Sequence, residues 1–401
     1  MDGTEGTGSM TLSFEMSAEQ VLLVDAARRI GQSYGLDYWH GLDQEQVPPL
    51  EYWQAICDAG LAGVALPESS GGAGLGMLEL VLIIEALCET GAGIALAQMF
   101  MMNAALGGQA IAQYGSDDMR RELLPKLLNG AEIMSFAMTE PSAGSNALDI
   151  RTYARAHESG WLLRGQKVWI TLASEARWML VIARTTPVDQ VARKTDGLSM
   201  FLLDGQREGI RRQKISKTGT RPLPAYEVFF DDVVVRHDEL IGTLDGAWPE
   251  LTAILNGERM VTAAGLVGTG RIAVKLACDY ATERKVYKNT PIASYQAIQF
   301  PLAQAHAQLE AARWMNRQAA WLMDRQRPFA SAANVAKLLA ADAACFATDR
   351  AVQTLGGMGF ASEFHVERLW RDARLFAVAP IPQEMILNFI AVHDLGLPRS
   401  Y

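Results

Sequence analysis

The chain has few cysteines and histidines, and neither type is spaced as a metal site requires. Its four cysteines, Cys57, Cys88, Cys278 and Cys345, stand singly along 401 residues. A disulfide scaffold or a zinc module needs closely spaced ligands, so neither is expected. The six histidines show no ligand spacing either, and we expect no metal. Reduced, mostly buried thiols are typical of a cytoplasmic protein.

Positive charge is also scarce. Lys and Arg number 36 against 45 Asp and Glu, which gives a net charge of -9 and opposes nonspecific attraction to nucleic acid or anionic membranes. The apolar stretch 78–106 is interrupted by Glu85, Glu89 and several glycines, so it falls short of an uninterrupted membrane span. We therefore expect neither a nucleic acid nor a membrane as partner.

The remaining composition is that of a globular protein. Hydrophobic residues make up 49% and charged residues 20% of the chain, and this length predicts two or three packed regions. Residues 1–9 are rich in Gly and Thr without a basic or apolar signal region, so Met10 is a candidate for the natural start.

The first third of the chain is expected to be helical. Apolar residues recur at helical spacing from position 17 to about 130. Ser17 and Gln20 form a capping-box pattern that opens the first helix, and the glycine cluster at 69–76 predicts a loop. We assign residues 10–130 to an all-α N-terminal domain.

The middle third changes to short runs of β-branched and aromatic residues separated by glycines. The runs are 161–163, 167–170, 178–183, 198–203 and 225–235. This spacing is typical of an antiparallel barrel or sandwich, which we assign to residues 131–245.

Long helical patterns return in the last third. They cover residues 251–282, 296–325, 330–355 and 385–394 and predict a four-helix bundle over residues 246–401. The expected fold class is therefore α+β, with a helical domain, a β domain and a helical bundle in that order.

One region departs from ordinary packing patterns. Residues 136–145 read F-A-M-T-E-P-S-A-G-S, and Trp169-Ile170-Thr171 follows about two dozen residues later. The small residues allow backbone N–H groups to approach a flat polar ring. Hydroxyl groups of Thr139 and Thr171 can satisfy the edge of such a ring, and Trp169 can cover one face.

Here the sequence resembles the acyl-CoA dehydrogenase family, whose usual wording is close to T-E-P-G-A-G-S-D followed by W-I-T. Ser142 and Asn146 depart from that wording. The resemblance implies FAD as cofactor, and it places Ser145 near the pantetheine arm of an acyl-CoA substrate as well. The FAD-binding residues that it implies in this region are Phe136, Met138, Thr139, Gly144, Ser145, Trp169, Ile170 and Thr171.

The resemblance extends into the last third and implies a second group of FAD-binding residues, contributed by a neighbouring subunit. A guanidinium at Arg284 suits a pyrophosphate because it offers several fixed donors. One residue is added after Tyr287 relative to the common family pattern. The group comprises Arg284, Tyr287, Gln296, Gln353, Gly356 and Gly357, and shared sites imply a homotetramer or homodimer.

The catalytic base is missing from its usual place. Many family members carry the glutamate that removes the substrate's α-proton in an E-G-T-S segment shortly after R-D-A. Here Arg371-Asp372-Ala373 leads to Pro380 at that position, and proline cannot take a proton.

A second family placement, as in isovaleryl-CoA dehydrogenase, puts the glutamate on a helix directly before an arginine. Glu258 matches it in Asn256-Gly257-Glu258-Arg259 and is the predicted base, with Asn256 and Arg259 as substrate-binding residues. Arg259 lies about 100° around the helix from Glu258, so a salt bridge between them is not automatic. Glu384 is the rival base.

The implied reaction is the α,β-dehydrogenation of an acyl-CoA thioester to trans-2-enoyl-CoA in fatty acid metabolism, with electrons passed to an electron-transfer flavoprotein. Two alternatives stay open. One is a flavin oxidase or monooxygenase of the same fold, because a fold does not determine a reaction. The other is an inactive partner subunit that has lost its base.

Overall fold

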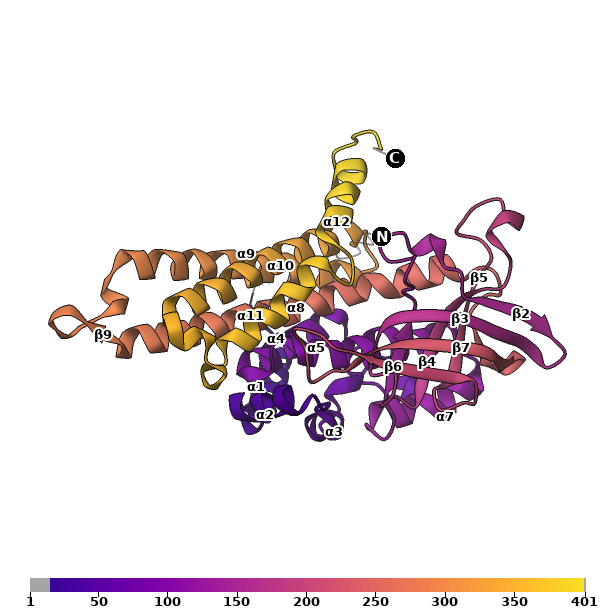
Figure 1. Ribbon diagram of the computed structural model, residues 1–401, viewed down its shortest axis with the longest axis horizontal. Coiled ribbons are helices and arrows are strands. Elements are labelled where there is room, and N and C mark those ends of the chain that lie inside the picture. Colours follow the sequence, from indigo (N-terminus) through magenta and orange to yellow (C-terminus); the bar gives the residue numbers. More distant parts are fainter. Residues whose placement is uncertain (1–14, 400–401) are drawn as a thin grey trace, which may run out of the picture.

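The computed structural model describes residues 15–399, so the expected start at Met10 lies outside the described residues. A helical region, a β domain and a set of long helices follow one another along the chain (Figure 1). The β domain lies toward one end of the long axis, and the long helices extend toward the other (Figure 1).

The N-terminal region is helical, as predicted. The capping box is present, since Ser17 Oγ accepts from the Gln20 backbone N–H and Gln20 Oε1 accepts from the Ser17 backbone N–H. The helices described in this region are α1 (Ala18–Ser33), α2 (Leu36–Glu45), α3 (Leu50–Asp58), α4 (Met77–Leu87), α5 (Ile94–Phe100), α6 (Gln109–Tyr114) and α7 (Asp117–Leu128).

Three helical segments among the described residues are long and apolar enough to cross a membrane by length and composition. They are Ile94–Tyr114, Ala247–Glu283 and Ala330–Phe360, and their most apolar windows are 94%, 72% and 50% buried inside the protein. Much of their apolar surface is thus covered by other elements of the chain. The segment Ile94–Tyr114 overlaps the stretch 78–106 and begins after Gly93, where the helical geometry breaks.

The middle β domain is built on one sheet with strand order β6-β7-β3-β2-β4-β5-β8 and with β1 beside β4. Neighbouring strands are antiparallel, except that β1 and β2 each pair with β4 in parallel. The predicted runs 161–163 and 167–170 are one strand, β3. The strands are β1 (Met134–Ala137), β2 (Tyr153–His157), β3 (Gly160–Thr171), β4 (Trp178–Arg184), β5 (Leu198–Asp204), β6 (Ile210–Ile215), β7 (Ala225–Arg236) and β8 (Leu240–Ile241).

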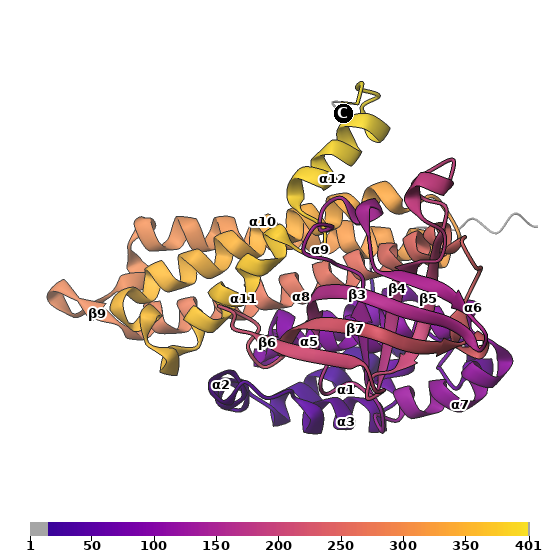
Figure 2. The ribbon, with the colours of Figure 1, turned by 45° about the vertical axis from the view of Figure 1, so that its right-hand side comes forward.

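The C-terminal bundle is confirmed, but its fourth helix is α11 rather than the predicted segment 385–394. Helix α11 packs against α8 and α10, whereas α12 projects away from the bundle (Figures 1 and 2). The elements are α8 (Ala247–Glu283), α9 (Gln296–Asp324), α10 (Ala330–Leu355), α11 (Val366–Val378) and α12 (Gln383–Phe389), with a short hairpin of β9 (Lys285–Val286) and β10 (Thr290–Pro291) between α8 and α9.

Helix α8 connects the three regions. The largest hydrophobic cluster contains Leu96 of α5, Leu180 of β4 and Met260 of α8. Gly265 of α8 permits the close approach of α5, because a Cβ there would meet Ala97 Cβ at 2.5 Å. Residues in the first half of α8 therefore lie where the helical region, the sheet and the bundle meet.

Candidate active site

The structure brings the two motifs of the middle region together. The backbone N–H of Val168 donates to Thr139 O at 2.9 Å, and Lys167 Nζ donates to Met138 O at 2.8 Å. The turn at 138–145 is thereby fixed against the part of β3 that carries Trp169.

A buried ion pair stabilises this junction. Lys167 Nζ lies 2.9 Å from Glu140 Oε1, and the two side chains are 0% and 4% exposed. The Glu140 carboxylate also accepts from the backbone N–H groups of Arg151 at 2.7 Å and Thr152 at 2.9 Å. Burial alone would raise the pKa of Glu140, but the charge of Lys167 and these hydrogen bonds outweigh it and hold that pKa below its ordinary value.

Trp169 leaves the regular strand at an irregularity of β3. The register against β7 shifts between Lys167 and Ile170, and Trp169 has a left-handed φ of 63°. A bulge re-aims a side chain, and here the indole is 54% exposed. It is therefore free to cover a flat ligand.

The donors around Trp169 fit the flavin ring that the sequence predicted. Among residues 15–399, the hydroxyl groups of Thr139 and Thr171 form no hydrogen bond within the chain, so both are available to a ligand. A Cβ built at Gly144 would meet nothing within 4 Å, so the turn faces open space. Ser145 is exposed beside it.

Three predicted FAD-binding residues are mainly core residues. Phe136 and Met138 pack against the large hydrophobic cluster, and Ile170 is 1% exposed in the interior of the β domain. Their side chains support the turn and the strand from behind, which leaves a cofactor contact to their backbone atoms.

The second predicted FAD-binding group lies at the other end of the molecule. Arg284 follows the last residue of α8 and directly precedes β9, which lies at the end of the molecule far from the β domain (Figure 1). It is 26 residues beyond Glu258, roughly 39 Å along the helix axis at 1.5 Å per residue. All six members of this group are exposed: Arg284, Tyr287, Gln296, Gln353, Gly356 and Gly357. Arg284 therefore lies far along α8 from the predicted base of the same chain.

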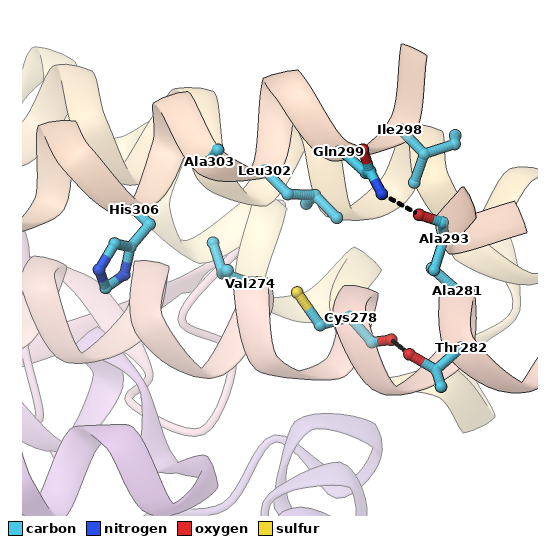
Figure 3. Close-up of a pocket in the computed structure, with 10 residues that line it drawn as sticks. All are labelled: Val274, Cys278, Ala281, Thr282, Ala293, Ile298, Gln299, Leu302, Ala303 and His306. Atoms are coloured by element: carbon cyan, nitrogen blue, oxygen red, sulfur yellow. Dashed lines mark hydrogen bonds between the residues drawn. The ribbon is translucent and has the colours of Figure 1, made fainter. Parts of the chain in front are cut away.

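A hollow of about 400 Å³ lies between α8 and α9 toward this distal end. Figure 3 shows Val274 and Cys278 on one side and Leu302 and His306 on the other. Within residues 15–399 no carboxylate lines the hollow, and Val274 is 16 residues past Glu258, roughly 24 Å along the axis. It is therefore separate from the predicted base.

Glu258 is a buried carboxylate on α8. Glu258 is 6% exposed. In the described part of the chain its carboxylate forms no hydrogen bond and no ion pair within 4.0 Å. Burial raises its pKa to about 7, against the opposing charges of Arg259 and Lys337. The rival, Glu384, is exposed in the first turn of α12.

Asn256 and Arg259, the predicted substrate-binding residues, lie together one turn apart. Arg259 Nη1 donates to Asn256 Oδ1, and both residues are half-buried. Arg259, whose salt bridge to Glu258 was not automatic on helical geometry, makes none in the part of the chain that the structure describes. Its guanidinium therefore keeps donors that are not used by the predicted base.

Two charged residues near the predicted site were missed by the sequence prediction. Lys167 stands two positions before Trp169, and Lys337 is an isolated cation in the alanine-rich helix α10. Both are 0% exposed. The signal for Lys337 was a single lysine in an otherwise apolar helix segment, which indicates either an exposed position or a buried charge with a partner.

Comparisons with known proteins give matches to all three regions of the chain. Family models of the acyl-CoA dehydrogenase N-terminal, middle and C-terminal domains match residues 17–131, 135–233 and 248–393. Acyl-CoA dehydrogenase FadE12 of Mycobacterium tuberculosis is 39% identical over 393 residues, which cover 97% of this chain and 99% of that protein.

Solved structures of two enzymes share the fold. Butyryl-CoA dehydrogenase from Megasphaera elsdenii is 26% identical with a TM-score of 0.90, covering 96% of this chain and 100% of that chain. The glutaryl-coenzyme A dehydrogenase complex with glutaryl-CoA is 26% identical with a TM-score of 0.91, covering 97% and 98%.

The chain belongs to the acyl-CoA dehydrogenase family. The resemblance drawn from its motifs is thereby confirmed, and the protein is a flavoprotein oxidoreductase with FAD as its cofactor.

Proposed function

We propose that the protein catalyses the α,β-dehydrogenation of an acyl-CoA thioester to the trans-2-enoyl-CoA, with Glu258 as the base. The observation that carries this proposal is the unpaired, buried carboxylate of Glu258 on the helix that joins the three regions. A carboxylate with a pKa of about 7 is a stronger base than an exposed glutamate and still ionises near neutral pH.

The residues of the chain divide the work. Glu258 removes the α-proton and becomes a neutral carboxylic acid. Bound FAD supplies the hydride acceptor for the β-carbon, so the pair of hydrogens leaves as a proton and a hydride. Thr139 and Thr171 orient the edge of the ring and Trp169 covers it, while the apolar surroundings of Glu258 exclude water from the proton transfer.

Asn256 and Arg259 are proposed to contact the substrate beside the base. Arg259 is anchored by its hydrogen bond to Asn256, and its remaining donors suit carbonyl oxygens of the thioester or pantetheine arm. Ser145, exposed on the turn, is proposed to meet the same arm from the β domain.

The active form is proposed to be a homotetramer or homodimer in the cytoplasm. The position of Arg284 at the end of α8 far from Glu258 supports this, because a second copy can supply the distal group. Tyr287 in that group is 85% exposed in the single chain. The family resemblance supports an electron-transfer flavoprotein as the electron acceptor.

The test is an anaerobic visible spectrum of the FAD-loaded protein during titration with short, branched and long acyl-CoAs. Bleaching of the flavin band by one thioester in the wild type, and its loss in Glu258→Gln, is the expected result. Glu384→Gln is the matched control, since it removes an exposed carboxylate and should bleach like the wild type.

Other results would overturn the proposal. Bleaching of Glu258→Gln at the wild-type rate would exclude Glu258 as the base. A flavin that dithionite reduces but no thioester bleaches would point to the inactive partner subunit, and rapid reoxidation in air after bleaching would point to an oxidase or monooxygenase.

A further inference from the structure

One exposed face of α9 is uncharged. The first half of the helix, residues 296–309, contains no Asp, Glu, Lys or Arg, although the solvent-facing side of a surface helix usually carries charged residues. At 100° per residue, seven residues of α9 lie within about 40° of Ala307 around the helix, and we call them the α9 face. They are Gln296, Phe300, Ala303, Ala307, Ala311, Trp314 and Gln318, and all seven are exposed.

Two aromatic side chains stand at the ends of the apolar part of this face. Phe300 is 61% exposed and Trp314 is 40% exposed, and the residues of the face between them are alanines. The hollow of about 400 Å³ between α8 and α9 borders the face, since Ala303 is among its lining residues (Figure 3). Projecting rings and an apolar recess therefore lie side by side, as is typical of an interaction surface.

The order of residues on the α9 face is symmetrical about Ala307. Ala303 and Ala311 each lie four residues from it, and Phe300 and Trp314 each lie seven residues from it. An antiparallel copy of α9, related by a two-fold axis at Ala307, would place Phe300 against Trp314 of the second copy and the reverse. The alanines let the two helices approach closely, and no like charges meet across the axis. The face is thus complementary to itself.

The same axis brings the distal FAD-binding group of one copy toward the base of the other. Gln296 of that group lies 11 residues from the axis and so faces Gln318 of the second copy. Gln318 is two residues past Asn316, whose side chain donates to Met260 O at 3.0 Å. Met260 follows Glu258 by two positions on α8. The pairing therefore puts Gln296 of one copy at the level of the predicted base of the other.

We propose that the α9 face joins two copies of this chain, packed antiparallel about a two-fold axis at Ala307. This inference deepens the proposed sharing of FAD sites between subunits and rests on it. The occupant is a second copy because the face is complementary to itself in both shape and charge. In this pairing Trp314 of the second copy lies beside the hollow at Ala303, where its indole is removed from water.

The test is disulfide cross-linking of the full-length, FAD-loaded protein in a Cys278→Ser background, which removes the exposed native thiol. Ala307→Cys should form a disulfide with its own copy, because this position lies on the axis. Ala303→Cys and Ala311→Cys should not cross-link when each is expressed alone, since each lies roughly 12 Å along the helix from its own copy. When the two are co-expressed with different affinity tags, they should cross-link to each other.

A charge at the axis gives a second readout. Ala307→Glu places two carboxylates opposite each other, so it should sediment as a smaller assembly than the wild type, with unchanged helix content by circular dichroism. Gln308→Glu is the matched control, because it adds the same charge about 100° around α9 and should sediment like the wild type.

Three results would overturn the interface. They are the absence of an Ala307→Cys cross-link, self cross-linking of Ala303→Cys as efficient as its cross-linking to Ala311→Cys, and wild-type sedimentation of Ala307→Glu. None of these readouts depends on catalysis. Cross-links as expected in a protein whose flavin no thioester bleaches would overturn the proposed dehydrogenation and support the interface.

Discussion

Lys167 and Glu140 form an ion pair of 2.9 Å in which both side chains are buried. Lys167 stands two residues before Trp169, and Glu140 directly follows Thr139. One buried ion pair therefore sets the relative position of the two motifs that are predicted to hold the flavin ring.

We predict that Lys167→Met lowers the free energy of unfolding by about 3–5 kcal/mol, because Glu140 is left as a buried charge without its partner. Chemical denaturation followed by tryptophan fluorescence measures this change. FAD content should fall in the same variant, since the turn at 138–145 loses its attachment to β3.

The double variant Lys167→Met/Glu140→Gln serves as the control. It removes both charges and should recover part of the lost stability. Equal losses in the single and the double variant would contradict the ionic explanation.

The sequence predicted the order of the three regions because their hydrophobic patterns are regular. The prediction missed α11, although Val366, Leu369, Ala373 and Phe376 recur at helical spacing on its buried face. Arg368 and Asp372 are 1% and 0% exposed and lie 3.6 Å apart, so a pattern of apolar residues alone undercounts the buried positions. The segment 385–394 was predicted as the fourth helix instead, but it packs little against the rest of the chain.

The candidate site could be predicted where its residues form short contiguous motifs. It could not be predicted where residues that are far apart in the sequence meet through tertiary contacts. The turn at 138–145 and the W-I-T segment could be read directly. Lys337 could not, because its partners Phe376 and Ile381 are backbone carbonyls that any sequence can supply. Strand β6 was missed for a different reason: four consecutive polar residues, 211–214, stand between Ile210 and Ile215 and hide the two-residue period.

Glu258 predicts opposite pH dependences for activity and stability. Its pKa is raised from 4.5 to about 7 in the folded protein, so at intermediate pH the folded state holds a proton that the unfolded state has released. The stability from this group is complete below about 4.5, falls as pH rises, and is lost above about 7. The change is on the order of 3 kcal/mol. Activity should rise over the same range, because the base must be ionised.

Denaturation and kcat/KM measured from pH 5 to pH 8 check both trends. Glu258→Gln cannot titrate at this position and is the control for stability. If its stability falls with pH as steeply as that of the wild type, another group is responsible.

Arg371 is predicted to hold the three regions together. It donates to Asp43 Oδ2 at 2.8 Å, to Thr218 O at 2.7 Å and to Glu367 Oε2 at 2.6 Å. These partners come from α2, the β domain and α11. Arg371→Ala should lower stability by roughly 2–4 kcal/mol, since the buried carboxylate of Asp43 loses a charged donor. Arg193→Ala, which breaks the exposed pair with Asp196, should change stability by less than about 1 kcal/mol.

The proposed sharing of FAD sites between subunits makes a specific prediction for mixed oligomers. Arg284→Ala removes the distal group's guanidinium and Trp169→Ala removes the indole that is proposed to cover the flavin ring, so each variant alone should lose FAD and activity. In a mixed dimer one site combines the intact Trp169 of one copy with the intact Arg284 of the other, while the second site carries both defects. Random pairing of equal amounts should restore about one quarter of the sites. Bound FAD and activity after co-expression measure this recovery. If both stay at the level of the single variants, the two groups do not meet across a subunit interface, and Arg284 has no part in a shared site.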